Sequence, residues 1–117
     1  MILSFYRISA ILGEPVVRGW LARRRARGKE DAARFKERRG ITSISRPPGP
    51  LIWLHAASVG EAISILSLVE RLRSERSDVS ILVTTGTVTS AEIMADRLPA
   101  GVLHQYAPVD LPRWTRR

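Results

Sequence analysis

The stretch Leu51-Ile-Trp-Leu-His-Ala-Ala-Ser-Val-Gly-Glu61 decides the fold, because a short apolar run ends there in a polar loop. The run from Leu51 to Ala57 follows a Pro/Gly break, which is typical of a buried strand. Apolar residues then recur at helical spacing as far as about residue 76: Ala62, Ile65, Leu66, Val69 and Leu72. We therefore expect a strand, a tight loop and a helix in this order.

The same pattern repeats downstream. Val79–Thr84 reads as a second buried strand, Thr89–Leu98 as a second helix and Val102–Tyr106 as a third strand. Alternating strands and helices with tight connections predict an α/β fold with a partial Rossmann-like parallel sheet. Right-handed crossovers would place the loops at 55–60 and 85–89 along one edge of the sheet, where ligands bind in such folds.

Upstream of the first strand, residues 40–50 contain three prolines, Pro47, Pro48 and Pro50, which lack backbone donors and prevent a helix or a central strand. We expect three parts: a helical arm at 1–39, a Pro/Gly-rich linker at 40–50, and the first βα units of a domain at 51–117.

Charge separates the arm from the rest of the 117 residues. Residues 1–50 hold 12 Lys and Arg against 4 Asp and Glu, whereas residues 51–117 hold 7 of each kind. Residues 1–22 form an amphipathic helical pattern in which Ser4, Arg7, Glu14 and Arg18 share a narrow arc with Ile11, and Pro15 introduces a kink.

A basic cluster follows this helix and consists of Arg23, Arg24, Arg25, Arg27 and Lys29. Basic side chains beside an apolar helix bind anionic headgroups, at about 1 kcal/mol each. We expect an anionic membrane surface as the partner of the arm. A partner helix is the alternative, and nucleic acid is disfavoured because aromatic residues are not interleaved with the basic ones.

Composition excludes several kinds of site. With no cysteine and two histidines, the chain has no disulfide, no thiolate zinc site and no multi-histidine metal site. We expect no metal and no cofactor.

The loop after the first strand supports two interpretations. Ser58-Val-Gly-Glu61 has the spacing of a capping box, and Thr89-Ser-Ala-Glu92 repeats it at the second helix. Alternatively, Glu61 at the carboxyl end of a strand is placed to take a proton from a bound hydroxyl, and Gly60 permits close approach of a substrate.

Four segments, in order, carry a resemblance that covers essentially the whole chain: Lys36–Gly40, Gly49–Glu61 with its His55-x-x-Ser-Val-Gly-Glu61 motif, Thr84–Thr89 and His104–Pro112. They closely resemble the amino-terminal region of the 3-deoxy-D-manno-octulosonic acid (Kdo) transferases, which act in lipopolysaccharide biosynthesis. The resemblance implies an inverting, metal-independent glycosyltransferase of the two-domain GT-B type, at the cytoplasmic face of the bacterial inner membrane.

The resemblance also implies roles for residues and partners. A lipid A precursor would be the acceptor and CMP-Kdo the donor, with Glu61 as the general base. Residues of the two loops would bind the acceptor: Ser58, Val59, Gly60, Thr84, Thr85, Gly86 and Thr87. A loop that merely caps the second helix is the alternative for the threonines. We expect His55 to be a core or supporting residue and Asp110 to shape a turn.

In the family, the donor-binding residues lie beyond position 117. We therefore expect a fragment that is inactive by itself. The alternative function is a non-catalytic adaptor at a membrane surface, which uses the basic amphipathic arm.

Overall fold

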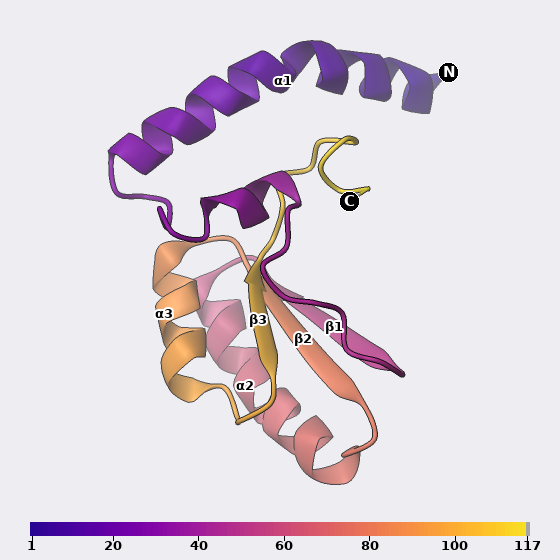
Figure 1. Cartoon of the computed structure of the whole chain (residues 1–117), viewed down its shortest axis with the longest axis vertical. Coiled ribbons are helices and arrows are strands. Elements are labelled where there is room, and N and C mark those ends of the chain that lie inside the picture. Colours follow the sequence, from indigo (N-terminus) through magenta and orange to yellow (C-terminus); the bar gives the residue numbers. More distant parts are fainter. Residues whose placement is uncertain (117) are drawn as a thin grey trace. The chain divides into compact units, whose positions relative to one another are not determined.

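The computed structural model describes residues 1–116. Its elements are α1 (Ile2–Ala26), a 3-10 helix η1 (Phe35–Arg39), β1 (Leu51–Ala56), α2 (Val59–Glu75), β2 (Ser80–Thr85), α3 (Val88–Arg97) and β3 (Leu103–Tyr106) (Figure 1). Contacts group Thr42–Ala107 into one unit, and Met1–Ile41 with the residues from Pro108 onward into a second. The predicted boundaries at 39 and 50 stay a prediction, although residues 108–116 group with the helical arm and not with the sheet.

The unit at 42–107 is a parallel sheet in the order β1-β2-β3, as predicted from the alternating pattern. The strands pair in register, with Ala56 opposite Thr85 and Thr85 opposite Tyr106, so their carboxyl ends lie at one edge. Helices α2 and α3 lie on the same side of this sheet (Figure 1). The predicted α/β, partial Rossmann-like fold with a preceding helix is therefore confirmed.

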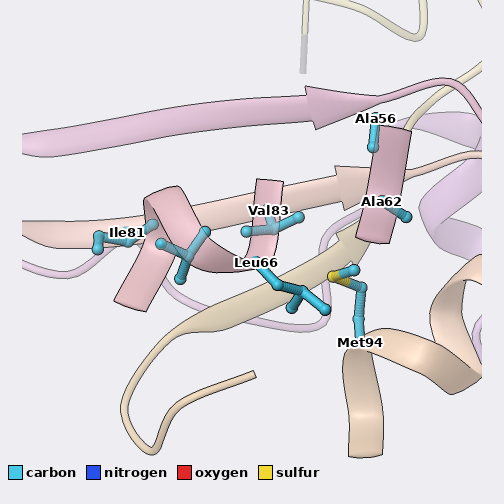
Figure 2. Packing of buried hydrophobic residues seen from close by; sticks show 7 residues of the cluster. Ala56, Ala62, Leu66, Ile81, Val83 and Met94 are labelled. Atoms are coloured by element: carbon cyan, nitrogen blue, oxygen red, sulfur yellow. The ribbon is translucent and has the colours of Figure 1, made fainter. Parts of the chain in front are cut away.

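A core between the helices and the sheet holds this unit together. Its buried members come from both strands and helices: Ala56, Ala62, Leu66, Val69, Ile81, Val83 and Met94. Figure 2 shows the side chains of Leu66 and Met94 directed toward one another. Each large side chain contributes about 1.5–3 kcal/mol by leaving water, so the helical spacing of residues 62–72 fixes which face of α2 is buried.

The predicted strand boundaries differ from the observed ones by at most one residue, whereas two predicted helix boundaries need correction. Helix α3 begins at Val88 and its N-cap is Thr87, whose hydroxyl accepts a hydrogen bond from the Ser90 N–H. Thr89 is therefore inside the helix and does not cap it. The N-terminal helix continues through Pro15 to Ala26, past the predicted end at 22, because loss of one donor at Pro15 does not stop a long helix.

The second unit is held by a small cluster in which Leu21 of α1 is buried with Leu111 and Trp114. Glu14 is also buried, and its carboxylate accepts two hydrogen bonds from the Arg18 guanidinium, at 2.9 and 2.6 Å. The Arg18 hydrogen bonds lower the pKa of Glu14. The polar arc of α1 thus supplies an ion pair in which Glu14 is buried and Arg18 is partly exposed.

The glycine at the end of η1 is expected to be essential to this unit. Gly40 has φ +73°, and a Cβ added there would overlap the backbone of Trp114. Gly40→Ala should therefore lower the free energy of unfolding by more than the about 1–2 kcal/mol that a left-handed conformation costs. Denaturant unfolding followed by tryptophan fluorescence measures the loss.

Gly28 provides the matched control, since it has φ +71° and no atom within 4 Å of an added Cβ. Gly28→Ala should lower the free energy of unfolding only by the cost of the left-handed conformation, without any steric overlap. Equal losses in the two variants would contradict the close approach of Trp114 to Gly40.

Candidate active site at the carboxyl edge of the sheet

The loop between β1 and α2 forms the predicted capping box. Ser58 is the N-cap of α2, in extended conformation, and its Oγ accepts a hydrogen bond from the Glu61 N–H at 3.2 Å. In return, Glu61 Oε2 accepts a hydrogen bond from the Ala57 N–H at 2.7 Å. The unpaired Glu61 N–H of the first turn is satisfied in this way, and the side chain of Glu61 reaches back to the residue before the N-cap.

Capping leaves the carboxylate of Glu61 accessible. The side chain is exposed at the edge where the parallel strands end. Oε2 is held by Ala57, and among residues 1–116 Oε1 has no hydrogen-bond partner. The carboxylate is thus fixed by one oxygen while the other remains able to accept a proton, so both interpretations of Glu61 are compatible with one geometry.

Removal of the Ser58 hydroxyl is expected to destabilise the domain moderately. Ser58→Ala deletes the acceptor for the Glu61 N–H, and loss of an N-cap costs typically about 1 kcal/mol. Urea unfolding should show this loss. Ser64→Ala is the control, because the Ser64 hydroxyl donates to the Glu61 carbonyl within α2 and caps nothing; a larger loss there than at Ser58 would contradict the cap.

The loop between β2 and α3 contributes less than its sequence suggests. Thr84 and Thr85 are the last residues of β2 and not, as predicted, part of the loop; both are buried, and their hydroxyls bind side chains of neighbouring strands. The Thr87 hydroxyl caps α3, whereas Gly86 has no atom within 4 Å of an added Cβ. The capping alternative therefore holds for Thr87, and acceptor binding by this loop stays a prediction that depends on its backbone and on Gly86.

Val59 and Gly60 complete the predicted acceptor-binding set. Both are exposed in the first turn of α2, beside Glu61. The structure therefore brings Ser58, Val59, Gly60 and Glu61 together in one exposed turn. Their binding of an acceptor stays a prediction.

His55 does not lie in the core. It is exposed on the sheet face opposite the helices, and its Nδ1 lies 3.0 Å from Thr84 Oγ1. Strand register places His55, Thr84 and Gln105 in one row across the sheet. We missed this polar row in the sequence, although alternation at positions 53 and 55, 82 and 84, and 103 and 105 marks one face of each strand.

Asp110 lies in a bend of the second unit, as expected for a turn residue. Its carboxylate also accepts a hydrogen bond from the Tyr6 hydroxyl at 2.9 Å, which raises the pKa of Tyr6. Asp110 thus helps to attach the end of the described chain to α1.

The basic cluster begins in the last turn of α1, which contains Arg23, Arg24 and Arg25, and it is partly engaged within its own unit. Arg24 binds the Glu30 carboxylate at 2.8 Å and lies over the Trp20 ring at 4.9 Å, while Arg25 lies over the Phe35 ring at 5.1 Å. A hollow of about 290 Å³ is lined by Trp20, Arg23, Arg24, Arg27 and Lys29. Four of the five predicted basic residues therefore surround one surface depression.

The apolar residues of α1 face outward along most of its length. Its exposed large apolar side chains are Ile2, Leu3, Phe5, Tyr6, Ile8, Ile11, Leu12, Val16 and Trp20. Within residues 1–116, no helix combines the length and the apolar character that a membrane span requires.

No group of three or more His, Asp or Glu side chains within the described part of the chain is arranged to hold a metal ion. The two histidines instead bond to threonines of β2, His55 to Thr84 and His104 to Thr85.

Comparison with known proteins identifies relatives. A family described as "3-Deoxy-D-manno-octulosonic-acid transferase (kdotransferase)" matches residues 33–117. A protein of Arabidopsis thaliana named "Probable 3-deoxy-D-manno-octulosonic acid transferase, mitochondrial" is 40% identical over 111 residues, which are 95% of this chain and 25% of that protein.

Two bacterial proteins named "3-deoxy-D-manno-octulosonic acid transferase" also match. The one from Rickettsia bellii is 43% identical over 71% of this chain and 20% of its own length. The one from Haemophilus influenzae is 33% identical over 92% of this chain and 26% of its own length. The chain thus spans about a quarter or less of these relatives, and no solved structure matches it.

Proposed function

Because the chain belongs to the 3-deoxy-D-manno-octulosonic acid (Kdo) transferase family, we propose that it forms the acceptor-binding part of an inverting GT-B glycosyltransferase. The enzyme would transfer Kdo from CMP-Kdo to a lipid A precursor. One observation carries this proposal: the carboxylate of Glu61 is exposed at the carboxyl edge of a parallel sheet, with one oxygen held by a backbone N–H and the other open.

The proposed chemistry assigns Glu61 the role of general base. A sugar hydroxyl of the acceptor comes within about 2.6–3.2 Å of the open carboxylate oxygen. Glu61 takes the hydroxyl proton while the acceptor oxygen attacks the anomeric carbon of Kdo from the face opposite CMP. The bond from that carbon to CMP breaks, CMP leaves with the bonding electrons, and the anomeric configuration inverts.

The capping box supports this role by fixing the carboxylate. Because Ala57 holds Oε2, the Glu61 side chain does not sample all of its rotamers, and the open oxygen is presented in one orientation. A base that is oriented before the substrate binds loses less freedom in the reaction. Ser58, Val59 and Gly60 would then contact the acceptor around Glu61.

The part of the family-length protein that binds the donor would be needed for turnover. The relatives extend to about four times the matched length or more. We therefore expect a polypeptide of these 117 residues to be inactive alone. The test of function compares CMP release from CMP-Kdo and a lipid A precursor by a family-length protein that carries residues 1–117 with release by its Glu61→Gln variant.

We also propose that α1 docks this protein on the cytoplasmic face of the bacterial inner membrane. Its exposed apolar face would enter the headgroup region, and the hollow beside Trp20 would take an anionic headgroup among the basic side chains. This surface would place a membrane-bound acceptor near the protein. A non-catalytic adaptor would use the same surface, and turnover by the wild type that is lost in the Glu61→Gln variant separates the enzyme from it.

A further inference from the structure

A buried hydroxyl joins two aromatic side chains on the sheet face opposite the helices. Thr84 is 2% exposed, and its Oγ1 lies 2.9 Å from Trp53 Nε1 and 3.0 Å from His55 Nδ1. Trp53 and His55 alternate on β1, and His55 is the register partner of Thr84 on β2. The three side chains therefore form one hydrogen-bonded group at the end of the two strands.

The direction of these hydrogen bonds follows from the donors available. An indole nitrogen only donates, so Thr84 Oγ1 accepts from Trp53. The Thr84 hydroxyl hydrogen then needs an acceptor, since a buried donor without one costs about 1–3 kcal/mol. Among the described residues the available acceptor is His55 Nδ1, which accepts only when the imidazole is neutral and its proton is on Nε2.

The group thus leaves His55 with one ring donor, the Nε2–H, that it does not use. The His55 side chain is exposed, and Nε2 has no partner within residues 1–116. His55 precedes by two residues Ala57, whose N–H holds the Glu61 carboxylate. The His55 imidazole and the Glu61 carboxylate therefore both lie at the carboxyl end of β1, where one ligand can contact both.

We propose that His55 is an acceptor-binding residue: the Trp53–Thr84–His55 group holds its imidazole as the Nε2–H tautomer, which donates to a phosphate or sugar oxygen of the acceptor substrate. The inference rests on the proposed function for the identity of the ligand. The tautomer itself depends only on the structure. The predicted tautomer and the predicted ligand can therefore be contradicted by separate experiments.

The tautomer is tested by nitrogen NMR of the 117-residue chain labelled with ¹⁵N-histidine. The chain contains only His55 and His104, so a His104→Gln variant assigns the signals. At a pH where the ring is neutral, we expect His55 to show an unprotonated Nδ1 and a protonated Nε2. Thr84→Val should shift this equilibrium toward a mixture of tautomers.

Thr85→Val is the matched control for the tautomer, since Thr85 Oγ1 lies 2.9 Å from His104 Nε2 on the adjacent strand. It should change the His104 signals and leave those of His55 as they are. A protonated Nδ1 on neutral His55, or no response to Thr84→Val, would overturn the proposed group.

Acceptor binding is tested without turnover, by calorimetry of the family-length protein with a lipid A precursor in detergent and without donor. His55→Asn keeps a polar atom near Thr84 but lacks the outer N–H, whereas the longer amide of His55→Gln restores an N–H near the position of Nε2. The dissociation constant should rise about tenfold or more in the Asn variant, as for the loss of a hydrogen bond to a charged group, and clearly less in the Gln variant.

Two acceptor substrates, one phosphorylated and one dephosphorylated, show which ligand oxygen His55 binds. If the Asn variant is weakened only toward the phosphorylated precursor, the ligand oxygen belongs to phosphate; if it is weakened equally toward a dephosphorylated precursor, the oxygen belongs to the sugar. Unchanged affinity in the Asn variant, or an equal loss in the Asn and Gln variants, overturns the binding role. Such a result would leave the Glu61 proposal standing, because CMP release measures that separately.

Discussion

A family-length protein with Glu61→Gln is expected to release CMP at least about a hundredfold more slowly than the wild type. A positioned general base contributes roughly 10²–10⁴-fold to rate, and an amide cannot accept the hydroxyl proton. The substitution is conservative for structure, because a glutamine at this position also completes a capping box. The carbonyl oxygen of Gln can keep the hydrogen bond from Ala57, so the loss should appear in turnover and not in the free energy of unfolding.

Glu92→Gln is the matched control for this loss. Glu92 is an exposed glutamate near the start of α3, the neighbouring helix, and belongs to the second S/T-x-x-E segment. It lies away from the capping box of α2, and its amide variant should turn over like the wild type. A Glu61→Gln variant that keeps wild-type turnover would remove Glu61 from the chemistry.

Replacement of two outward apolar side chains on α1 is expected to release the protein from membranes. Phe5 and Leu12 are both 75% exposed, and burial of each such side chain is worth about 1.5–3 kcal/mol. The Phe5→Ser/Leu12→Ser variant should therefore bind anionic phospholipid vesicles about a hundredfold more weakly in a flotation or sedimentation assay. Its fold should be unaffected, since neither side chain is buried.

The matched control changes exposed apolar residues outside α1. Ile63 and Leu68 are 45% and 47% exposed on α2, so the Ile63→Ser/Leu68→Ser variant should bind vesicles like the wild type. Arg23→Gln/Arg27→Gln should weaken binding to anionic vesicles but not to neutral ones, by about 1 kcal/mol per charge at low salt. Equal vesicle binding by the α1 and α2 variants would contradict docking through α1.

Sequence patterns predicted the sheet and its helices because the spacing of apolar residues along each segment is enough to determine these elements. The strand at Leu51–Ala56 is mostly apolar, and the apolar residues of α2 recur at helical spacing on one face. Packing this face of α2 on the sheet buries the apolar residues of both elements. The start of α3 was misplaced because Thr87 and Thr89 both precede suitable residues, and the Thr89-x-x-Glu92 spacing imitates a capping box. Ser90 and Ala91 are buried, and this requirement favours a helix that begins one residue earlier.

Contacts between distant residues could not be predicted in this way. Tyr6 and Asp110 are 104 positions apart, and Glu14 is buried in a unit that also includes Trp114. Similarly, the Trp53–Thr84–His55 group depends on strand register, which places side chains opposite one another only after the sheet has formed. His55 was expected to be a core or supporting residue, and its exposed side chain excludes only the core position.

The most direct test of the central claim is mass spectrometry of the acceptor. A family-length protein that carries residues 1–117 is incubated with CMP-Kdo and a lipid A precursor, and the product is analysed with released CMP. We predict that the precursor gains Kdo and that an equal amount of CMP appears, with both signals lost in the Glu61→Gln variant. An acceptor of unchanged mass in the presence of folded, membrane-bound wild-type protein would contradict the assignment of this chain to Kdo transfer.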